Sequence, residues 1–469
     1  MLFNSLHYLI FLPVVCVAYF SIRGVVSRKV FLLAASLYFY CVYSAPLCLL
    51  LLWSALANYA AARIIYTGRR ESVRRAALIC SVVANVGLLG FFKYYEFMRV
   101  TVGSAIGQSL LPALKVPLPL GISFYTFCMI SYTVDVYRRE LAATKSLGDL
   151  ALYVSFFPHS VAGPIMRGGA LLGQFSERHW VNLERISCGA FIIARGLAKK
   201  VFVADPAGRI ADSVFGGLGS TAGVGQYSWV SLLLASYAFA VQIYCDFSGY
   251  SDIAVGSALM LGIRLARNFD APYLSLSIRE FWQRWHISLS TWLRDYVYIA
   301  LGGNRGSRLR AYANVLITML IGGLWHGANW TFVVWGLLQG IVVCGERATG
   351  ATGGSGVVHG WWRRIGRWAI TFHLICLGWI FFRCSTFGQA IQVVGRIVTL
   401  ADGVNTGYAA AVYLCIVLAL QAADARLDFD VFPLRHPLLA RWAVYGVYVV
   451  VVVSLLIGSG SQEFLYFQF

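Results

Sequence analysis

The sequence predicts an all-α, polytopic integral membrane protein, and three observations lead to this fold class. Hydrophobic residues make up 59% of the 469 residues and charged residues only 12%, about half of the roughly 25% typical of soluble domains. Apolar runs recur along the whole chain, many approaching the ~20 residues that a spanning helix needs. The basic residues gather between these runs. We therefore expect most of the protein surface to contact lipid.

The apolar runs define the predicted spanning helices. We expect roughly eleven or twelve passes, together with re-entrant or interfacial helices. No basic leader precedes the first run and no small-residue cleavage site follows it, so we expect a spanning helix there and not a removable signal peptide. The runs lie at about 5–22, 30–44, 46–62, 77–92, 119–137, 187–204, 228–246, 311–325, 330–345, 366–382, 407–421 and 440–458.

The positive charge of the chain is interpreted as a signal of topology. Lys and Arg number 38 against 20 Asp and Glu, an excess that in a soluble domain would suggest a nucleic-acid partner. Here the basic residues lie in loops, so we expect no nucleic-acid partner. The positive-inside rule makes these loops cytoplasmic and places the N-terminus on the opposite side of the membrane. The basic clusters are Arg23, Arg28 and Lys29; Arg63, Arg69, Arg70, Arg74 and Arg75; and Arg138, Arg139 and Lys145.

The chain divides by the placement of its polar residues. Residues 1–147 have the pattern of helical hairpins and are predicted to be scaffold, whereas residues from about 148 to 330 bring polar and ionisable side chains into apolar segments. Such residues are costly in a membrane and indicate a site or a water-filled cavity. FFPHSVAGPIMR at 156–167 predicts a broken or re-entrant element. His159 there either serves that cavity or satisfies the backbone at a helix break.

Two segments carry the strongest candidates for chemistry. REFWQRWHISLSTWLRDYVYIALGGNR at 279–305, if helical, places His286 near Gln283 and Ser290; an interfacial anchor with snorkelling arginines is the alternative. LIGGLWHGANWTFVVW at 320–335 places His326 in an apolar surround. Desolvation favours a neutral imidazole, which can accept a proton from a hydroxyl that attacks an acyl group. A hydrogen bond across helices or a bound cofactor is the alternative for His326.

The remaining polar features give weaker predictions. YCDFSGYSD at 244–252 either lines a polar tunnel or caps a helix that is broken at Gly249. The 11 cysteines are scattered with no metal-ligand spacing, so we expect no metal site. No G-x-S-x-G elbow, H-E-x-x-H pair or P-loop is present.

A series of motifs resembles the membrane-bound O-acyltransferase (MBOAT) family, most nearly the bacterial branch that O-acetylates alginate. The resemblance covers nearly the whole chain. In chain order the motifs are FFKYYEF at 91–97, PLGISFYTF at 119–127, SYTVDVYR at 131–138, FFPHSVAGPI at 156–165, AKKVFVAD at 198–205, DFSGYSDIAVG at 246–256, EFWQRWHISLSTWLRDYVYIALGGNR at 280–305, GGLWHGANW at 322–330 and YFQF at 466–469.

The resemblance implies a single membrane domain over 1–469, with scaffold helices at 1–147, a catalytic core at 148–345 and C-terminal helices at 346–469. It also implies a ring of helices around a central tunnel, a catalytic His326 and a second active-site residue at His286. No tightly bound cofactor is expected; the acyl donor is acetyl-coenzyme A or a carrier-bound acetyl thioester. Expected partners are a periplasmic acetyltransferase protein and a polysaccharide acceptor, with the chain in the bacterial inner membrane and its N-terminus periplasmic.

The function predicted on this basis is transfer of an acetyl group across the inner membrane to hydroxyls of an exported polysaccharide such as alginate. Cellulose, peptidoglycan and teichoic acid are the alternative acceptors. A polysaccharide-export transporter or a scaffold subunit without acyl chemistry is the alternative from another class. A transporter should show repeat symmetry in its hydropathy, and the sequence shows no such pairing.

Overall fold

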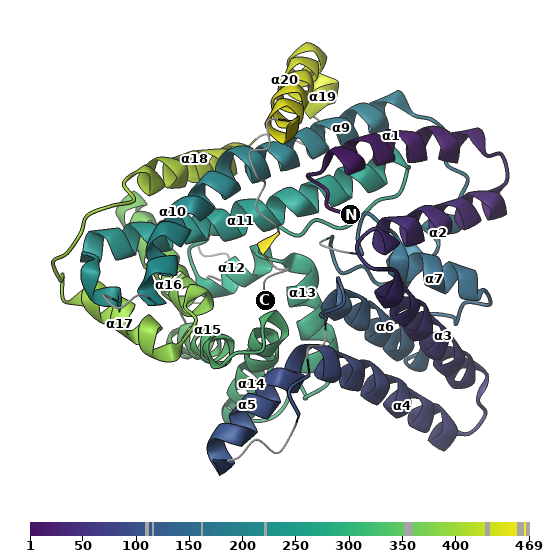
Figure 1. Ribbon diagram of the computed structural model, residues 1–469. Helices are drawn as coiled ribbons and strands as arrows, with labels where there is room; N and C mark the ends of the chain where they lie inside the picture. The colour runs from purple at the N-terminus through teal and green to yellow at the C-terminus, as the bar shows by residue number, and fades with distance from the viewer. Residues whose placement is uncertain are drawn as a thin grey trace. The chain divides into compact units, whose positions relative to one another are not determined.

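The computed structural model describes residues 1–107, 112–114, 117–160, 163–219, 223–350, 360–426, 432–456 and 464–465. Helices make up nearly all regular structure in these ranges (Figure 1), and the only strand-type pairing there is an isolated bridge between Tyr227 and Val404. The predicted all-α class is confirmed. The YFQF motif at 466–469 and residues 161–162 of the predicted broken element lie outside the described residues.

The helices follow the predicted apolar runs along the chain. The first half contains α1 (Leu6–Ser21), α2 (Val25–Cys41), α3 (Ala45–Thr67), α4 (Glu71–Leu89), α5 (Tyr95–Ile106), α6 (Ile122–Tyr137), α7 (Leu147–Ser155), α8 (Gly168–Leu171), α9 (Leu183–Ala198) and α10 (Asp205–Phe215). The second half contains α11 (Trp229–Met260), α12 (Ile278–Arg284), α13 (Ile287–Leu293), α14 (Arg308–His326), α15 (Trp330–Thr349), α16 (Trp361–Arg383), α17 (Phe387–Val398), α18 (Ala409–Asp424), α19 (Phe432–Arg435) and α20 (Pro437–Leu456).

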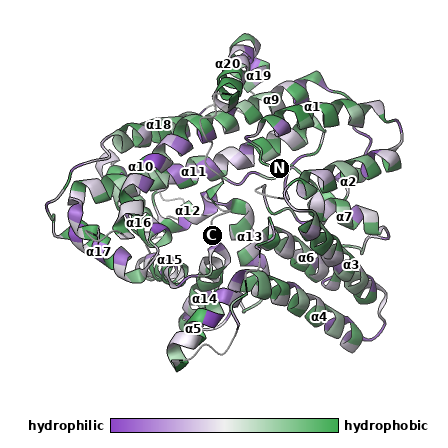
Figure 2. Ribbon diagram, viewed as in Figure 1, coloured by the Kyte–Doolittle hydropathy of each residue, from purple (hydrophilic) through white to green (hydrophobic). Residues whose placement is uncertain are grey.

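Several helices of the described ranges are suited to crossing a membrane by their length and composition. Within the described ranges, 6 helical segments are long and apolar enough to span, and two shorter apolar helices accompany them. The other predicted runs also form helices, which are shorter or carry more polar residues. The number of roughly eleven or twelve passes therefore stays a prediction. The apolar character of the helices is visible in Figure 2. The spanning segments are Ala45–Thr67, Glu71–Ile106, Trp229–Met260, Trp330–Thr349, Trp361–Arg383 and Pro437–Ser454.

The described residues fall into two compact units. The first comprises the described parts of Met1–Arg195, Tyr250–Ala266 and Pro433–Ser459, and the second those of Gly196–Gly249, Arg267–Phe432 and Gly460–Phe469. His159 belongs to the first unit, whereas His286 and His326 belong to the second. The two predicted catalytic histidines therefore share one packed unit.

One basic cluster of the first unit takes part in the fold. The Arg28 side chain is buried and donates to the carbonyl oxygens of Ile22 and His179, and Lys29 pairs with Asp149 at 2.9 Å. A buried guanidinium is tolerated because backbone carbonyls replace its hydration. Arg28 and Lys29 therefore stabilise the fold, in addition to forming one of the basic clusters on which the topology prediction rests.

The helix α11 is continuous, so of the two alternatives for residues 244–252, the helix broken at Gly249 is ruled out. Gly249 instead permits close approach of the preceding segment, because a Cβ there would lie 2.8 Å from the carbonyl oxygen of Gly196. The two carboxylates of this helix each take an ion-pair partner. Asp246 pairs with Lys200 at 2.7 Å, and Asp252 pairs with Arg195 at 2.9 Å.

Candidate functional site

The segment around His286 is a broken helix. Ser277 begins α12 by accepting a hydrogen bond from the backbone N–H of Glu280, and the helix ends at Arg284. Trp285 is extended, and His286 adopts a left-handed conformation with φ of 42° before α13 begins. The segment is therefore not one helix, and the side-chain spacing that a single helix would give does not apply. Because non-glycine residues rarely adopt positive φ, the surrounding contacts must fix this conformation.

Asn268 holds the break in place. Its carbonyl oxygen accepts the backbone N–H of Ile287 at 2.9 Å, and its side-chain oxygen accepts the Ser288 hydroxyl at 2.6 Å. Asn268 is itself buried. Sequence reasoning missed this residue, since a lone asparagine in a loop carries no recognisable motif.

His286 is fully buried among aromatic rings. The Phe247 ring meets it edge-on with centroids 4.6 Å apart, and the Trp325 ring lies 5.5 Å from it. Burial lowers the pKa of His286, so the imidazole is neutral at physiological pH. Its predicted neighbour Ser290 contacts it through the backbone, because the Ser290 N–H donates to the His286 carbonyl oxygen at 2.9 Å.

His326 is the last residue of α14. The helix ends there because Gly327 is extended, and Asn329 then begins α15 by accepting the Thr331 N–H at 3.1 Å. A Cβ at Gly327 would overlap the Phe332 ring, so only glycine fits this short connection. The tight hairpin fixes where the imidazole lies.

The glycines of this hairpin have two different roles. Gly323 lies where α14 and α15 cross, and a Cβ there would collide with the Phe332 carbonyl oxygen and come within 3.1 Å of the Gly336 Cα. This is close helix packing through small residues. Gly322, one residue earlier, instead faces a cavity. Adjacent residues therefore serve close helix packing and leave space for a substrate.

Three aromatic rings surround the imidazole of His326, which is 3% exposed. The centroids of Trp325, Trp335 and Phe382 lie 4.9, 5.0 and 5.2 Å from its own. Phe382 comes from α16, beyond the 148–345 stretch that the sequence singled out as the core. Motif reasoning could not find it, because nothing local to Phe382 marks it as a neighbour of His326.

The two predicted catalytic histidines both contact the same residue, Trp325. Trp325 contacts both rings, at 5.5 Å from His286 and 4.9 Å from His326, so their centroids are no more than about 10 Å apart. His159 has a different environment. Its Nε2–H donates to the Tyr153 carbonyl oxygen at 2.7 Å, which is the backbone-satisfying role that the sequence left open.

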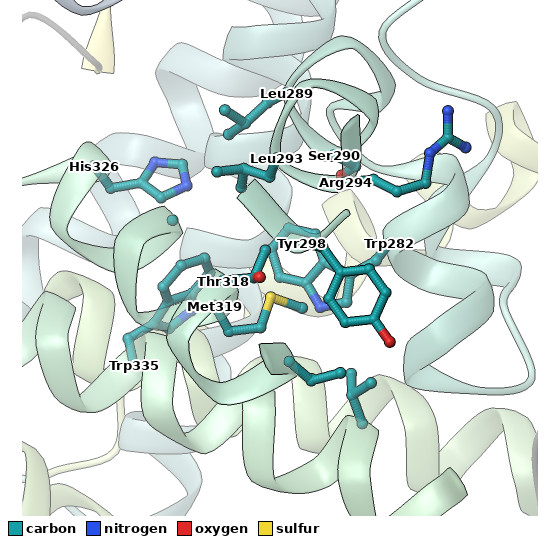
Figure 3. A pocket seen from close by; sticks show the side chains of 13 residues that line it. Trp282, Leu289, Ser290, Leu293, Arg294, Tyr298, Thr318, Met319, His326 and Trp335 are labelled. Carbon is teal, nitrogen blue, oxygen red and sulfur yellow. The ribbon is translucent and has the colours of Figure 1, made fainter. Parts of the chain in front are cut away.

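A cavity of about 190 Å³ opens beside His326. Figure 3 shows the His326 ring at one side of it and Arg294 with Tyr298 at the other. Its walls are almost entirely apolar. The lining consists of Trp282, Leu289, Ser290, Leu293, Arg294, Tyr298, Val315, Thr318, Met319, Gly322, His326, Trp335 and Val343.

This arrangement suits acyl transfer on a small substrate. An imidazole at the wall can accept a hydroxyl proton when it is neutral, and apolar walls keep competing water away from a reactive acyl group. Ligand pockets for drug-sized molecules are roughly 300–1,000 Å³, so the cavity is matched to a short group. No cluster of three or more His, Cys, Asp or Glu side chains suited to a metal occurs within the described part of the chain.

The fold and this site define a multi-pass membrane protein with a buried histidine facing a small apolar cavity. The chain belongs to the membrane-bound O-acyltransferase family, whose model matches residues 75–387. It is therefore an acyltransferase, and the transporter and scaffold alternatives are set aside. The predicted resemblance is confirmed.

Curated relatives share most of the chain. It is 43% identical to the probable alginate O-acetylase AlgI of Pseudomonas aeruginosa, over 83% of this chain and 73% of the relative. It is 37% identical to the peptidoglycan O-acetyltransferase of Helicobacter pylori, over 86% of this chain and 81% of the relative. The teichoic acid D-alanyltransferase of Bacillus subtilis is 26% identical over 73% of this chain and 85% of the relative.

Proposed function

We propose that the protein moves an acetyl group from a cytoplasmic thioester to hydroxyls of an exported polysaccharide of the alginate type. The single observation that carries this proposal is the position of His326 at the wall of a small apolar cavity in a chain that is 43% identical to a probable alginate O-acetylase. The alternative acceptor is peptidoglycan, which the 37% identity to a peptidoglycan O-acetyltransferase favours.

In the proposed reaction, His326 acts as general base. Its imidazole takes the proton of an acceptor hydroxyl while the oxygen attacks the thioester carbonyl. The carbon–sulfur bond then breaks, and the thiol leaves with the proton that the imidazolium returns. His286, on the other side of Trp325, is proposed to orient a reacting group within the same site.

Different sides of the cavity are suited to different parts of the acyl donor. Its apolar walls would receive the acetyl group beside His326, and the opposite side carries Arg294, which pairs with Asp295 at 2.7 Å. A guanidinium at the edge of an apolar pocket is suited to an anionic donor, acetyl-coenzyme A or an acetylated carrier. A periplasmic acetyltransferase partner would complete transfer to the polymer. The chain would lie in the inner membrane with its N-terminus periplasmic, an orientation that the positions of the basic loops support.

The test is the acetyl content of the secreted polysaccharide in cells that carry the wild type, His326→Ala or His286→Ala at matched membrane levels. General-base catalysis contributes about 10²–10⁴-fold, so His326→Ala should lower acetyl content at least about 100-fold with normal polymer export. Unchanged acetylation would remove His326 from the chemistry. Loss of polymer export would instead favour an export role.

A further inference from the structure

A buried ion cluster lies in the second unit, outside the cavity. Lys200 Nζ lies 2.8 Å from Asp205 and 2.7 Å from Asp246, and none of these side chains is more than 5% exposed. Burial by itself lowers the pKa of Lys200, but Asp246 and Asp205 outweigh this effect and raise it, so the lysine is charged. Buried charges in a membrane protein are costly, and they usually mark a function.

The cluster also binds the end of the chain. The second carboxylate oxygen of Asp246 accepts the backbone N–H of Leu465 at 2.7 Å. Asp246 therefore binds Lys200 through one carboxylate oxygen and the backbone of Leu465, 219 residues later in the chain than Asp246, through the other. Both Phe464 and Leu465 are buried, and Leu465 belongs to the hydrophobic core of this unit.

Phe464 connects this part of the chain to the aromatic rings that surround His286. Its ring lies 5.9 Å from the ring of Phe247, and Phe247 meets His286 edge-on at 4.6 Å. His286 is held at a positive φ of 42°. Because such a conformation persists only when its surroundings determine it, each ring packed behind His286 contributes to its placement.

We propose that Lys200 and Asp246 anchor the C-terminal segment Phe464–Leu465, which acts as a positioning element for His286. The anchor fixes the Leu465 N–H, the fixed backbone places Phe464, and Phe464 supports Phe247 behind the imidazole. This inference rests on the proposed role of His286 in acyl transfer. Phe464 and Leu465 touch no reacting atom in this scheme, so they are positioning residues.

Two pairs of variants test separately the hydrogen bond from Leu465 to Asp246 and the packing of Phe464 on Phe247. Leu465→Pro removes the N–H that Asp246 accepts, and Leu465→Ala keeps it while losing the side chain. Phe464→Ala removes the supporting ring, and Phe464→Leu restores apolar bulk. Phe3→Ala is the matched control for lost stability, because Phe3 is equally buried and its ring contacts are Tyr8, Phe39 and Tyr250.

The experiment measures purified full-length protein in lipid nanodiscs by two readouts. One is turnover of acetyl-coenzyme A, used as the thioester probe; the other is amide hydrogen exchange of Ile287 and Ser290, whose N–H groups are bonded at the His286 break. Leu465→Pro and Phe464→Ala should each lower kcat about tenfold with KM unchanged, and should speed this exchange. Leu465→Ala and Phe464→Leu should remain near the wild type in both readouts.

The control separates positioning from general destabilisation. Phe3→Ala should lower the melting temperature without changing kcat of the folded protein or exchange at Ile287 and Ser290. Unchanged exchange in Leu465→Pro and Phe464→Ala, or faster exchange with wild-type kcat, would overturn the inference. If the wild type itself turns over no acetyl thioester, the proposed function fails, and the exchange readout alone still decides whether the C-terminal segment fixes the His286 region.

Discussion

Two buried histidines of this protein lie in segments that the sequence marks in the same way, and the structure gives them different environments. His159 and His326 are 2% and 3% exposed; His159 lies in the turn that follows α7, and His326 is the last residue of α14. His159 donates to the carbonyl oxygen of Tyr153 within its own turn. His326 forms one wall of a cavity of about 190 Å³.

The difference shows that burial and a broken helix do not by themselves identify a catalytic histidine. A ring that satisfies a backbone carbonyl in a packed turn has no room for a substrate, whereas a ring on the wall of a cavity has. Access to empty space beside the imidazole is therefore the property that favours His326 over His159. The variants below alter either the surroundings of His326 or the side chain of His159.

The largest expected effect comes from filling the cavity. Gly322 lines it, and a Cβ at this position would already lie 3.2 Å from Leu293 Cδ1. Gly322→Leu should therefore occupy the space beside His326 and lower acetyl content of the polymer about 100-fold, as misplaced substrates do. Gly345→Leu, on an exposed position of α15 with open space around it, is the control. Wild-type acetylation in Gly322→Leu would show that the cavity does not hold the acyl group.

A smaller effect should follow from changing the helix crossing that supports His326. Gly323→Ala places a methyl group against the Phe332 carbonyl oxygen and the Gly336 Cα, and overpacking of this kind costs about 1–3 kcal/mol. The unfolding free energy in detergent should fall by that amount. Gly345→Ala should leave stability equal or slightly higher, since alanine favours helices over glycine. Equal stability of the two variants would show that α14 and α15 can separate without cost.

Local patterns in the sequence were sufficient for the helices and for the pair of histidines. Hydropathy located the helical segments because apolar runs are a local property. The motifs around His286 and His326 pointed to one site, and the shared contact with Trp325 brings both rings within it. The catalytic roles themselves stay predictions.

Features that depend on distant contacts could not be predicted. The left-handed turn at His286 depends on Asn268, and the wall of the His326 site includes Phe382 from another helix. At Gly249 the same limitation left two alternatives open. A glycine in a polar segment predicts a break, but here it serves the close approach of Gly196 within a continuous helix.

The smallest effect concerns the pH dependence of stability on the His159 side of the comparison. Burial lowers the pKa of His159 from 6.5 to about 4, so folding favours the neutral ring. The stabilisation is fully present above about pH 6.5 and is lost as the pH falls toward 4; between pH 7 and pH 5 the free energy of unfolding should fall by about 2 kcal/mol.

The variant His159→Gln tests this pH dependence, because glutamine does not titrate but still offers a donor to the Tyr153 carbonyl oxygen. The unfolding free energy of His159→Gln should therefore change less between pH 7 and pH 5. At neutral pH, the acetyl transfer of each folded molecule should stay at the wild-type level. His7→Gln, at an exposed position of α1, is the matched control for the substitution itself. A loss of acetyl transfer in His159→Gln would place His159 in the chemistry and remove the distinction between the two histidines.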